Sequence, residues 1–258
     1  MVNHVTVTHA QGVLTLTLAR PDKMNALTSA MYATLADAIS GAESDPAVRV
    51  IVIRGEGAMF TAGNDLGEFA AFATGAAPAG ESQVARFLRA LAGCAKPLVA
   101  AVNGRAVGVG TTLLLHCDFV VLAEDALLST PFVNLALVPE AASSLLLPAR
   151  IGYARAFEMF ALGKPISAAQ ALAWGIANRV VPVAQLHGEA HQVAELLAKQ
   201  AAGSLKMTKQ LMQQATAVTA QMNLEGEQFA ERLRSPEARE AFTAFAQKRA
   251  PDFSKFAA

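Results

Sequence analysis

The chain opens with two stretches in which apolar residues alternate with polar ones, at residues 4–9 and 12–19. A period of two is typical of strands with one buried face, and the turn residues between the two stretches predict a hairpin. From Thr28 onwards apolar residues recur four positions apart, which predicts an amphipathic helix with Thr28 as its N-cap. The apolar run Val48–Ile53 predicts the next strand.

Helical patterns and continuous apolar runs alternate over the next part of the chain. Helices are expected at residues 81–92 and 111–117, and strands at residues 97–102 and 118–123. Strands that are apolar on both faces are typical of a mainly parallel sheet, in which ligands bind at the carboxyl ends of the strands. The loops TAGND and NGRAVGVG, at residues 61–65 and 103–110, are both expected at that edge.

Helical patterns dominate the chain after residue 150. Serines of the N-cap type begin two of the expected helices, at Ser167 and Ser235. A short strand is expected at residues 176–181. We therefore predict an α/β core over residues 1–195, which holds the active site, followed by a helical region over residues 196–258.

The composition is that of a globular protein with a large buried core, since 53% of the 258 residues are hydrophobic and 16% are charged. Acidic and basic residues are equal in number, 21 each. The chain thus lacks the excess positive charge by which proteins bind nucleic acids or anionic membranes. Small molecules and protein partners remain, and no nucleic acid is expected.

The sequence also predicts a cytoplasmic protein. Polar residues interrupt every apolar stretch before it reaches the roughly 20 residues that span a bilayer, so no membrane contact is expected. The N-terminus lacks a signal-peptide pattern, and the chain ends KFAA, without a peroxisomal signal. The two cysteines, Cys94 and Cys117, are too few for a disulfide framework, and no cysteine and histidine spacing predicts a metal site.

Several common catalytic motifs are missing. The sequence has no G-x-x-x-x-G-K-[ST], no G-x-G-x-x-G that opens a helix, no G-x-S-x-G and no H-E-x-x-H. What remains is the two loops at the sheet edge and one carboxylate, Glu140, the single charged residue of the stretch 129–144. This combination suits backbone N–H groups that stabilise an oxyanion while a base removes a nearby proton. On its own, however, a glutamate after a proline is more often a first-turn residue of a helix.

Four motifs, in order along nearly the whole chain, resemble the enoyl-CoA hydratase/isomerase family. They are RPDKMNAL at 20–27, FTAGNDL at 60–66, VNGRAVGVGTTLLLHCD at 102–118, and TPF with VPEAASS at 130–144. The resemblance implies the crotonase fold, a ββα spiral core with C-terminal helices that build a trimer or a dimer of trimers. It implies an acyl-CoA thioester as substrate, with no cofactor beyond the coenzyme A that the substrate carries. It also places an oxyanion hole at the backbone N–H groups of Asn64 and Val109.

The residues that differ from the hydratases of the family indicate the reaction. Hydratases resemble one another in carrying two glutamates, whose positions match Thr112 and Phe132 here. Holding and deprotonating a water suits two positioned groups, and these two side chains cannot replace them. Glu140, directly after Pro139, instead resembles the single carboxylate of the peroxisomal-type Δ3,Δ2-enoyl-CoA isomerases. One departure is Ala141, where that subgroup usually has glycine.

The same resemblance implies a set of residues that contact the substrate or coenzyme A. They are Lys23, Met24, Ala62, Asp65, Leu66, Phe132 and Lys248. Asp65 is expected to brace its loop rather than to act as a second acid, and His116 to be a core histidine with its hydrogen bonds satisfied. A hydratase or another enolate-forming acyl-CoA enzyme stays the enzymatic alternative. A non-catalytic acyl-CoA-binding scaffold is the alternative of another class.

Overall fold

The computed structural model describes residues 4–65, 67–68 and 82–256. Within them, a larger sheet has the strand order β1-β2-β3-β4-β6-β9 and a smaller sheet the order β5-β7-β8. The strands are Val5–Ala10 (β1), Val13–Leu18 (β2), Val50–Gly55 (β3), Leu98–Val102 (β4), Arg105–Val107 (β5), Phe119–Ala123 (β6), Leu127–Ser129 (β7), Ile166–Ser167 (β8) and Arg179–Val181 (β9). In the larger sheet only the pair β1–β2 is antiparallel, which confirms the hairpin and the mainly parallel sheet.

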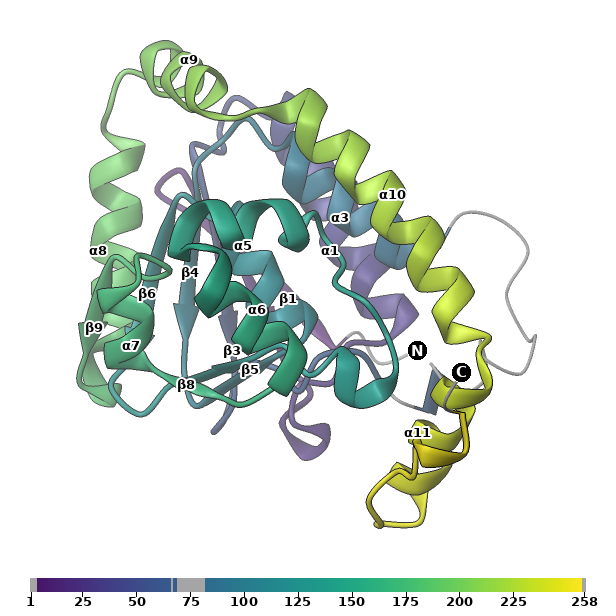
Figure 1. Cartoon of the computed structure of the whole chain (residues 1–258). Coiled ribbons are helices and arrows are strands. Elements are labelled where there is room, and N and C mark those ends of the chain that lie inside the picture. The colour runs from purple at the N-terminus through teal and green to yellow at the C-terminus, as the bar shows by residue number, and fades with distance from the viewer. Residues whose placement is uncertain (1–3, 66, 69–81, 257–258) are drawn as a thin grey trace.

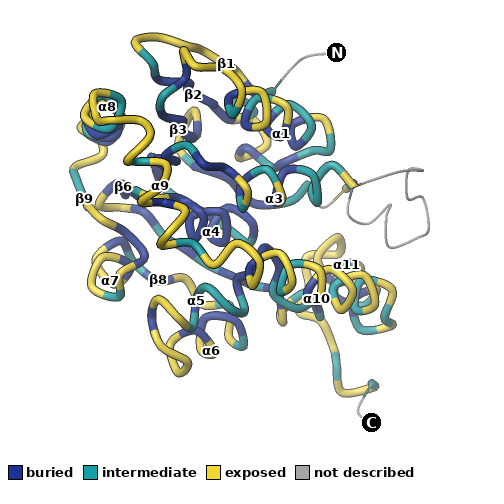
Figure 2. The backbone as a smooth tube through the Cα atoms, turned by 90° about the horizontal axis from the view of Figure 1, so that it is seen from above, coloured by how far each residue is buried: buried dark blue, intermediate teal, exposed yellow. Residues whose placement is uncertain are grey.

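Helices cover both faces of the larger sheet (Figures 1 and 2). Helices α1 (Ser29–Ser44) and α3 (Gln83–Gly93) pack together on one face, within the larger hydrophobic cluster. Helix α8 (Leu186–Ala198) packs on the opposite face, in a second cluster. The Thr28 side chain accepts a hydrogen bond from the N–H of Met31, which confirms the N-cap of α1. Residue 81, where the sequence placed the start of α3, lies outside the described residues.

Strand β3 begins two residues later than the predicted Val48 and runs on to Gly55. The N–H of Val48 donates to the carbonyl oxygen of Asp45 at 3.2 Å and so closes the turn after α1. The ladder with β2 starts only at the pair Val13–Val50. Val48 is nevertheless buried. The apolar side chain of Val48 is therefore explained by its burial in the core, although the residue is not part of the strand.

The segment after β4 also differs from its prediction. The loop at 103–110 contains β5, and the expected helix begins at residue 109 as α4 (Val109–Thr112), which continues as the 3-10 turn η2 (Leu113–His116). Gly108 explains the early start. It has a φ of +57°, and its carbonyl oxygen accepts hydrogen bonds from the N–H groups three and four positions further on. The segment α4 lies buried between the sheet and the C-terminal helices (Figure 2).

The second half of the chain is mostly helical, as predicted. Besides α8, its helices are α5 (Ser143–Ile151), α6 (Tyr153–Leu162), α7 (Ala168–Ala173), α9 (Ala202–Met212), α10 (Ala215–Leu233) and α11 (Pro236–Ala246). The side chains of Ser167 and Ser235 cap α7 and α11, which confirms both N-caps. Helix α10 lies along α3 and α5 of the same chain (Figure 1). The division at residue 195 stays a prediction. None of the helices within the described ranges has the length and apolar character needed to cross a membrane.

Candidate active site

Two loops meet at the carboxyl ends of β3 and β4, where the sequence analysis placed them. The N–H of Thr61 donates to the carbonyl oxygen of Arg105, and the N–H of Val107 donates to that of Thr61, both at 3.1 Å. Gly63 has a φ of +87°, and a Cβ at this residue would lie 2.7 Å from the carbonyl oxygen of Val107. A side chain at position 63 would therefore force the two loops apart.

Each loop carries one of the two N–H groups assigned to the oxyanion hole. The residues on either side of Asn64 are fixed, because the N–H of Leu27 donates to Gly63 and the N–H of Asp65 donates back to Leu27. Val109 is the first residue of α4 and is 1% exposed. In the described part of the chain, neither the N–H of Asn64 nor that of Val109 donates a hydrogen bond. Both donors are thus available to an acceptor from outside the chain.

Tyr32 on α1 holds the side chain of Asn64. Its hydroxyl donates to Asn64 Oδ1 at 2.5 Å, and its ring packs on Phe87 at a centroid distance of 5.4 Å. Burial raises the pKa of Tyr32 well above its ordinary value, and the charges of Glu140 and Glu68 raise it further. The phenol therefore stays protonated and keeps donating. The negative charge of Glu140 is thus near enough to affect the phenol.

Glu140 is a buried carboxyl group, at 9% exposure, and its partner is a hydroxyl group. The Thr112 hydroxyl donates to Glu140 Oε1 at 2.6 Å. Burial raises the pKa of Glu140 to about 7 from its ordinary 4.5, while the hydrogen bond from Thr112 lowers it and the charge of Glu225 on α10 raises it. Thr112, one of the two positions that the sequence analysis matched to hydratase glutamates, therefore holds the carboxyl group of Glu140 in place.

The backbone after Glu140 turns sharply. Ala141 and Ala142 both have left-handed conformations, with φ of +62° and +54°. Ala141 thus adopts a conformation that glycine, usual here in the isomerase subgroup, reaches more easily. His116 Nε2–H donates to the Ala141 carbonyl oxygen at 2.8 Å, and burial lowers the pKa of this histidine to about 4. His116 is therefore a neutral core histidine with a satisfied hydrogen bond, as predicted.

Three of the predicted coenzyme A contacts, Ala62, Met24 and Lys23, lie close together in the structure. The N–H of Ala62 donates to the carbonyl oxygen of Met24 at 2.9 Å, and the Met24 side chain is exposed. Lys23 ends the exposed 3-10 turn η1 (Pro21–Lys23) just before it. These three residues line the outer edge of the loop that carries Asn64. Leu66, a further member of the predicted set, lies outside the described residues.

Asp65 braces its loop, as expected. Its carboxylate pairs with Arg20 Nη1 at 2.6 Å, and its Oδ1 accepts hydrogen bonds from the N–H groups of Gly67 and Glu68. The hydrogen bond from Arg20 is the main reason that the pKa of Asp65 is lowered. An ionised, fully bonded carboxylate at this place supports the loop and is a poor proton donor.

Phe132 is buried in the core and packs against Phe160 at a centroid distance of 6.2 Å. Its carbonyl oxygen accepts the N–H of Leu137 at 2.8 Å, so its backbone stabilises the segment that leads to Glu140. It has no acid or base function to offer at the position that matches the second hydratase glutamate.

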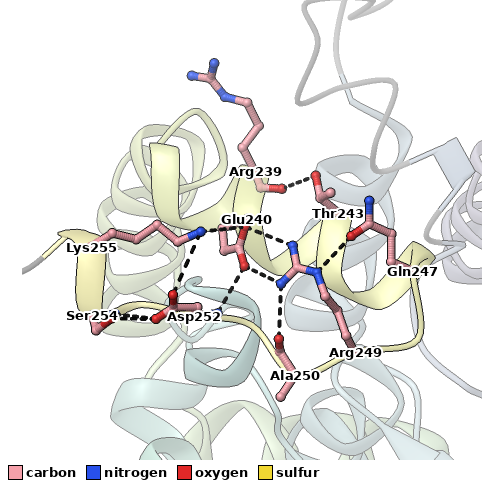
Figure 3. Close-up of polar contacts among 9 residues, drawn as sticks. All are labelled: Arg239, Glu240, Thr243, Gln247, Arg249, Ala250, Asp252, Ser254 and Lys255. Carbon is pink, nitrogen blue, oxygen red and sulfur yellow. Dashed lines mark hydrogen bonds and ion pairs between the residues drawn. The ribbon is translucent and has the colours of Figure 1, made fainter.

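Lys248 follows α11 and is exposed. Within the described ranges, no hydrogen bond or ion pair joins its side chain to the two loops. Its neighbour Arg249 pairs with Glu240 of the same chain at 2.5 Å, in a cluster that also holds Asp252 and Lys255 (Figure 3). Within the single chain, Arg249 is thus held by Glu240, whereas the side chain of Lys248 is exposed.

Sequence reasoning did not find Tyr32, or the function of Thr112 as a partner of Glu140. Tyr32 sits on the apolar face of α1 beside Met31 and Leu35 and had the pattern of a core residue. Both residues reach the site only through contacts between distant segments. No three His, Cys, Asp or Glu side chains cluster as a metal ion would require among the residues that the structure describes.

The comparison with known proteins agrees with this geometry. The sequence model of the enoyl-CoA hydratase/isomerase family matches residues 8–255. The chain is 38% identical over 250 residues to the 1,2-epoxyphenylacetyl-CoA isomerase of Escherichia coli K12, covering 95% of each chain. It is 35% identical over 254 residues to the 2,3-dehydroadipyl-CoA hydratase of that strain, covering 98% and 99%. The crystal structure of an enoyl-CoA hydratase/isomerase from Pseudoalteromonas atlantica T6c matches with a TM-score of 0.93 at 41% identity, covering 98% of this chain and 100% of that one.

The fold and these matches define an enzyme of the isomerase and hydratase type that acts on acyl-CoA thioesters. The chain belongs to the enoyl-CoA hydratase/isomerase family, and its fold is the crotonase fold expected from the sequence, an α/β core with C-terminal helices. An isomerase and a hydratase are similar to it to nearly the same degree. The choice between the two reactions therefore depends on the site residues.

Proposed function

We propose that this protein is an acyl-CoA double-bond isomerase that converts Δ3-enoyl-CoA into Δ2-enoyl-CoA. The observation that carries the proposal is the buried carboxyl group of Glu140, held at 2.6 Å by the hydroxyl of Thr112. A double-bond shift needs one group that takes a proton and gives it back. Hydration needs a second acid or base, and Thr112 and Phe132 stand at the two positions that would carry glutamates.

The proton transfer uses the geometry as follows. The N–H groups of Asn64 and Val109 donate to the thioester oxygen, while the carboxylate of Glu140 takes a proton from C2. The C2–H electron pair moves into the C1–C2 bond, and the charge settles on the thioester oxygen as a dienolate. Glu140 then returns the proton to C4, and the double bond lies between C2 and C3. No atom is gained or lost, so the reaction requires no cofactor.

Two physical effects make an ordinary glutamate adequate for this task. Each N–H donor in an oxyanion hole contributes about 2.7–4 kcal/mol to the stabilisation of the developing charge. Burial raises the pKa of Glu140 to about 7, so its carboxylate is a stronger base than an exposed glutamate and is still ionised in about half of the molecules at neutral pH.

Absorbance of the conjugated enoyl thioester tests the reaction. The protein is mixed with 3-trans-hexenoyl-CoA in one cuvette and with crotonyl-CoA in another. We expect the conjugated band to grow in the first and to persist in the second. Loss of the band from crotonyl-CoA, with no change in the first cuvette, would favour the hydratase. Binding of acyl-CoA of several chain lengths without turnover would favour the scaffold.

The Glu140→Gln variant tests the base. Glutamine keeps the shape and the hydrogen bond from Thr112 but cannot take a proton, so we expect isomerase activity to fall by about 10²- to 10⁴-fold. The matched control is Glu158→Gln on the exposed face of α6, which should keep wild-type activity. Full activity in Glu140→Gln would rule out Glu140 as the base.

We also propose that the protein assembles as a trimer or a dimer of trimers. The support within the chain is a group of large apolar side chains exposed on α9 and α10, namely Met207, Leu211, Met212 and Leu224. Apolar surface of this kind favours self-association.

A further inference from the structure

Behind the turn that carries Glu140 lies a second buried carboxyl group, that of Glu225 in the middle of α10. Glu225 is 5% exposed. Its Oε1 accepts hydrogen bonds from the N–H of Ser144 at 2.8 Å and from the Ser144 hydroxyl at 2.5 Å. Gln221, one helical turn earlier, donates to the same hydroxyl at 2.8 Å. The C-terminal helix α10 is thereby tied to the first turn of α5.

This tie holds a strained stretch of backbone. The two alanines between Glu140 and α5 have left-handed conformations, which non-glycine residues adopt only when their surroundings enforce them. His116 fixes this turn from one side, through the carbonyl oxygen of the first alanine. Glu225 fixes it from the other side, at the start of α5. The contact to Glu225 is thus one of the restraints on the turn that carries Glu140.

Among the described residues, the carboxyl group of Glu225 has no counterion. Its Oε2 has no hydrogen-bond partner among the described residues. In the same part of the chain, neither Glu225 nor Glu140 forms an ion pair with a lysine or an arginine. Burial raises the pKa of Glu225, while hydrogen bonds to Ser144 and Ala142 lower it. A negative charge on this residue raises the pKa of Glu140.

Among the described residues, the other titratable groups considered around the two glutamates are neutral or are bonded to different partners. Burial raises the pKa of Tyr32 on α1, so its phenol is neutral. Burial lowers the pKa of His116 on η2 to about 4, so its imidazole is neutral at pH 7. Arg150 of α5 and Arg232 of α10 keep their positive charge, but Arg150 donates to the Leu115 carbonyl oxygen and Arg232 pairs with Glu237. The charge of Glu225 therefore acts on Glu140 without an ion-paired cation at either carboxyl group in the described part of the chain.

We propose that Glu225 is a positioning residue of the active site: it clamps the turn that bears Glu140 and places a second carboxyl group behind it. The inference rests on the proposed role of Glu140 as the base. Glu225 does not touch the reacting atoms. It acts through Glu140, first by fixing its place and second by increasing its affinity for a proton, which makes it a better base for C2. The active site of this chain thus includes part of α10.

The pH dependence of isomerase activity in Glu225→Gln tests the electrostatic effect. The Oε1 of glutamine still accepts from Ser144, so the clamp remains while the charge is removed. We expect the acidic limb of the kcat profile to move down by about half a unit to one unit, and kcat on the plateau to fall roughly fivefold, with KM within about twofold of the wild type. Glu227→Gln, on the exposed face of α10, is the control and should match the wild type. A wild-type profile in Glu225→Gln would overturn the proposal.

A titration that needs no turnover separates this inference from the proposed function. The side-chain carboxyl carbon of Glu140 is followed by ¹³C NMR in protein labelled at glutamate, with its signal assigned by its loss in Glu140→Gln. We expect its apparent pKa to be lower in Glu225→Gln than in the wild type, even if the protein isomerises no enoyl-CoA. An unchanged midpoint would overturn the inference while leaving the proposed reaction untouched.

Ser144→Ala separates the clamp from the charge. It removes the hydroxyl that Glu225 and Gln221 share but keeps the Glu225 carboxyl group. We expect kcat to fall roughly threefold to tenfold because the turn is held less firmly, while the Glu140 carbon still titrates near its wild-type midpoint. Wild-type kcat in both Ser144→Ala and Glu225→Gln would show that α10 has no positioning effect.

Discussion

Glu140 is the residue at which stability and chemistry oppose each other. The folded chain favours its neutral form, because burial removes the water that would solvate the charge. The proposed reaction requires the ionised form, because only the carboxylate takes the proton from C2. With a pKa of about 7, both the neutral and the ionised form are populated near neutral pH. The site therefore gains a stronger base, and the fold gives up stability whenever that base is ready to act.

The pH dependence of stability follows from this shift. Between pH 4.5 and 7 the folded state binds a proton at Glu140 that the unfolded chain has lost. The corresponding stabilisation is fully present below about pH 4.5 and is lost as the pH rises through 7. It amounts to roughly 3 kcal/mol. We therefore expect Glu140→Gln to melt at about the wild-type temperature at pH 4.5 and roughly 5–10 °C above it at pH 8. Calorimetry at both values checks this, and an equal difference at the two pH values would contradict it.

At the scale of elements, the site depends on how closely two loops approach. The bonds between Thr61 and the segment around β5 set the separation of the N–H groups of Asn64 and Val109. Gly63 allows this approach, because there is no space for a Cβ next to the Val107 carbonyl oxygen. The oxyanion hole is therefore determined by the contact between the loops as much as by the two residues that donate.

Gly63→Ala should separate the two donors. The added Cβ would meet the Val107 oxygen at 2.7 Å, and its φ of +87° disfavours alanine. A misplacement of about 1 Å costs on the order of 100-fold in rate, so we expect kcat to fall by about that factor. The control is Gly93→Ala at the end of α3, where a Cβ meets nothing within 4 Å. Activity is measured with the enoyl-CoA absorbance assay. If both variants keep wild-type activity, the loop contact does not set the donor geometry.

Periodicity predicted the elements whose pattern comes from local geometry. The hairpin, the capped helix α1 and the parallel strands all belong to this group. It misplaced the start of β3, because burial of Val48 resembles strand burial. It also missed the 3-10 turn after α4, because three buried leucines have the same composition in either helix type. Among the proposed site residues, Glu140 could be predicted from its sequence motif alone, because the resemblance does not depend on tertiary contacts. Tyr32 and Glu225 were not found, because their contacts join segments far apart in the chain.

At the scale of the whole molecule, α9 presents its apolar side chains to the outside. Met207, Leu211 and Met212 are 63%, 86% and 80% exposed. The same helix is anchored on its inner side by Lys209, whose Nζ pairs with Asp118 at 2.6 Å. A firmly seated helix with an apolar outer face is typical of an interface between subunits.

Self-association through α9 can be tested by light scattering coupled to gel filtration. We expect the wild type to elute with three or six times the chain mass. Leu211→Glu places a charge on the exposed apolar face and should shift the protein toward smaller species, because a charge without a partner is costly in an interface core. Lys206→Glu, also exposed on α9, is the matched control. A wild-type protein with the mass of one chain would refute the proposed assembly.

The bond between Thr112 and Glu140 bears on how this sequence can evolve. A glutamate introduced at position 112 would remove the hydroxyl that holds Glu140 and add a third carboxyl group, where the described residues form no ion pair with Glu140 or Glu225. A chain with all three glutamates would be less stable than the present one, since three like charges cannot all remain ionised at such close range. The proposed isomerase site therefore tolerates a glutamate at position 112 only if position 140 or 225 changes as well.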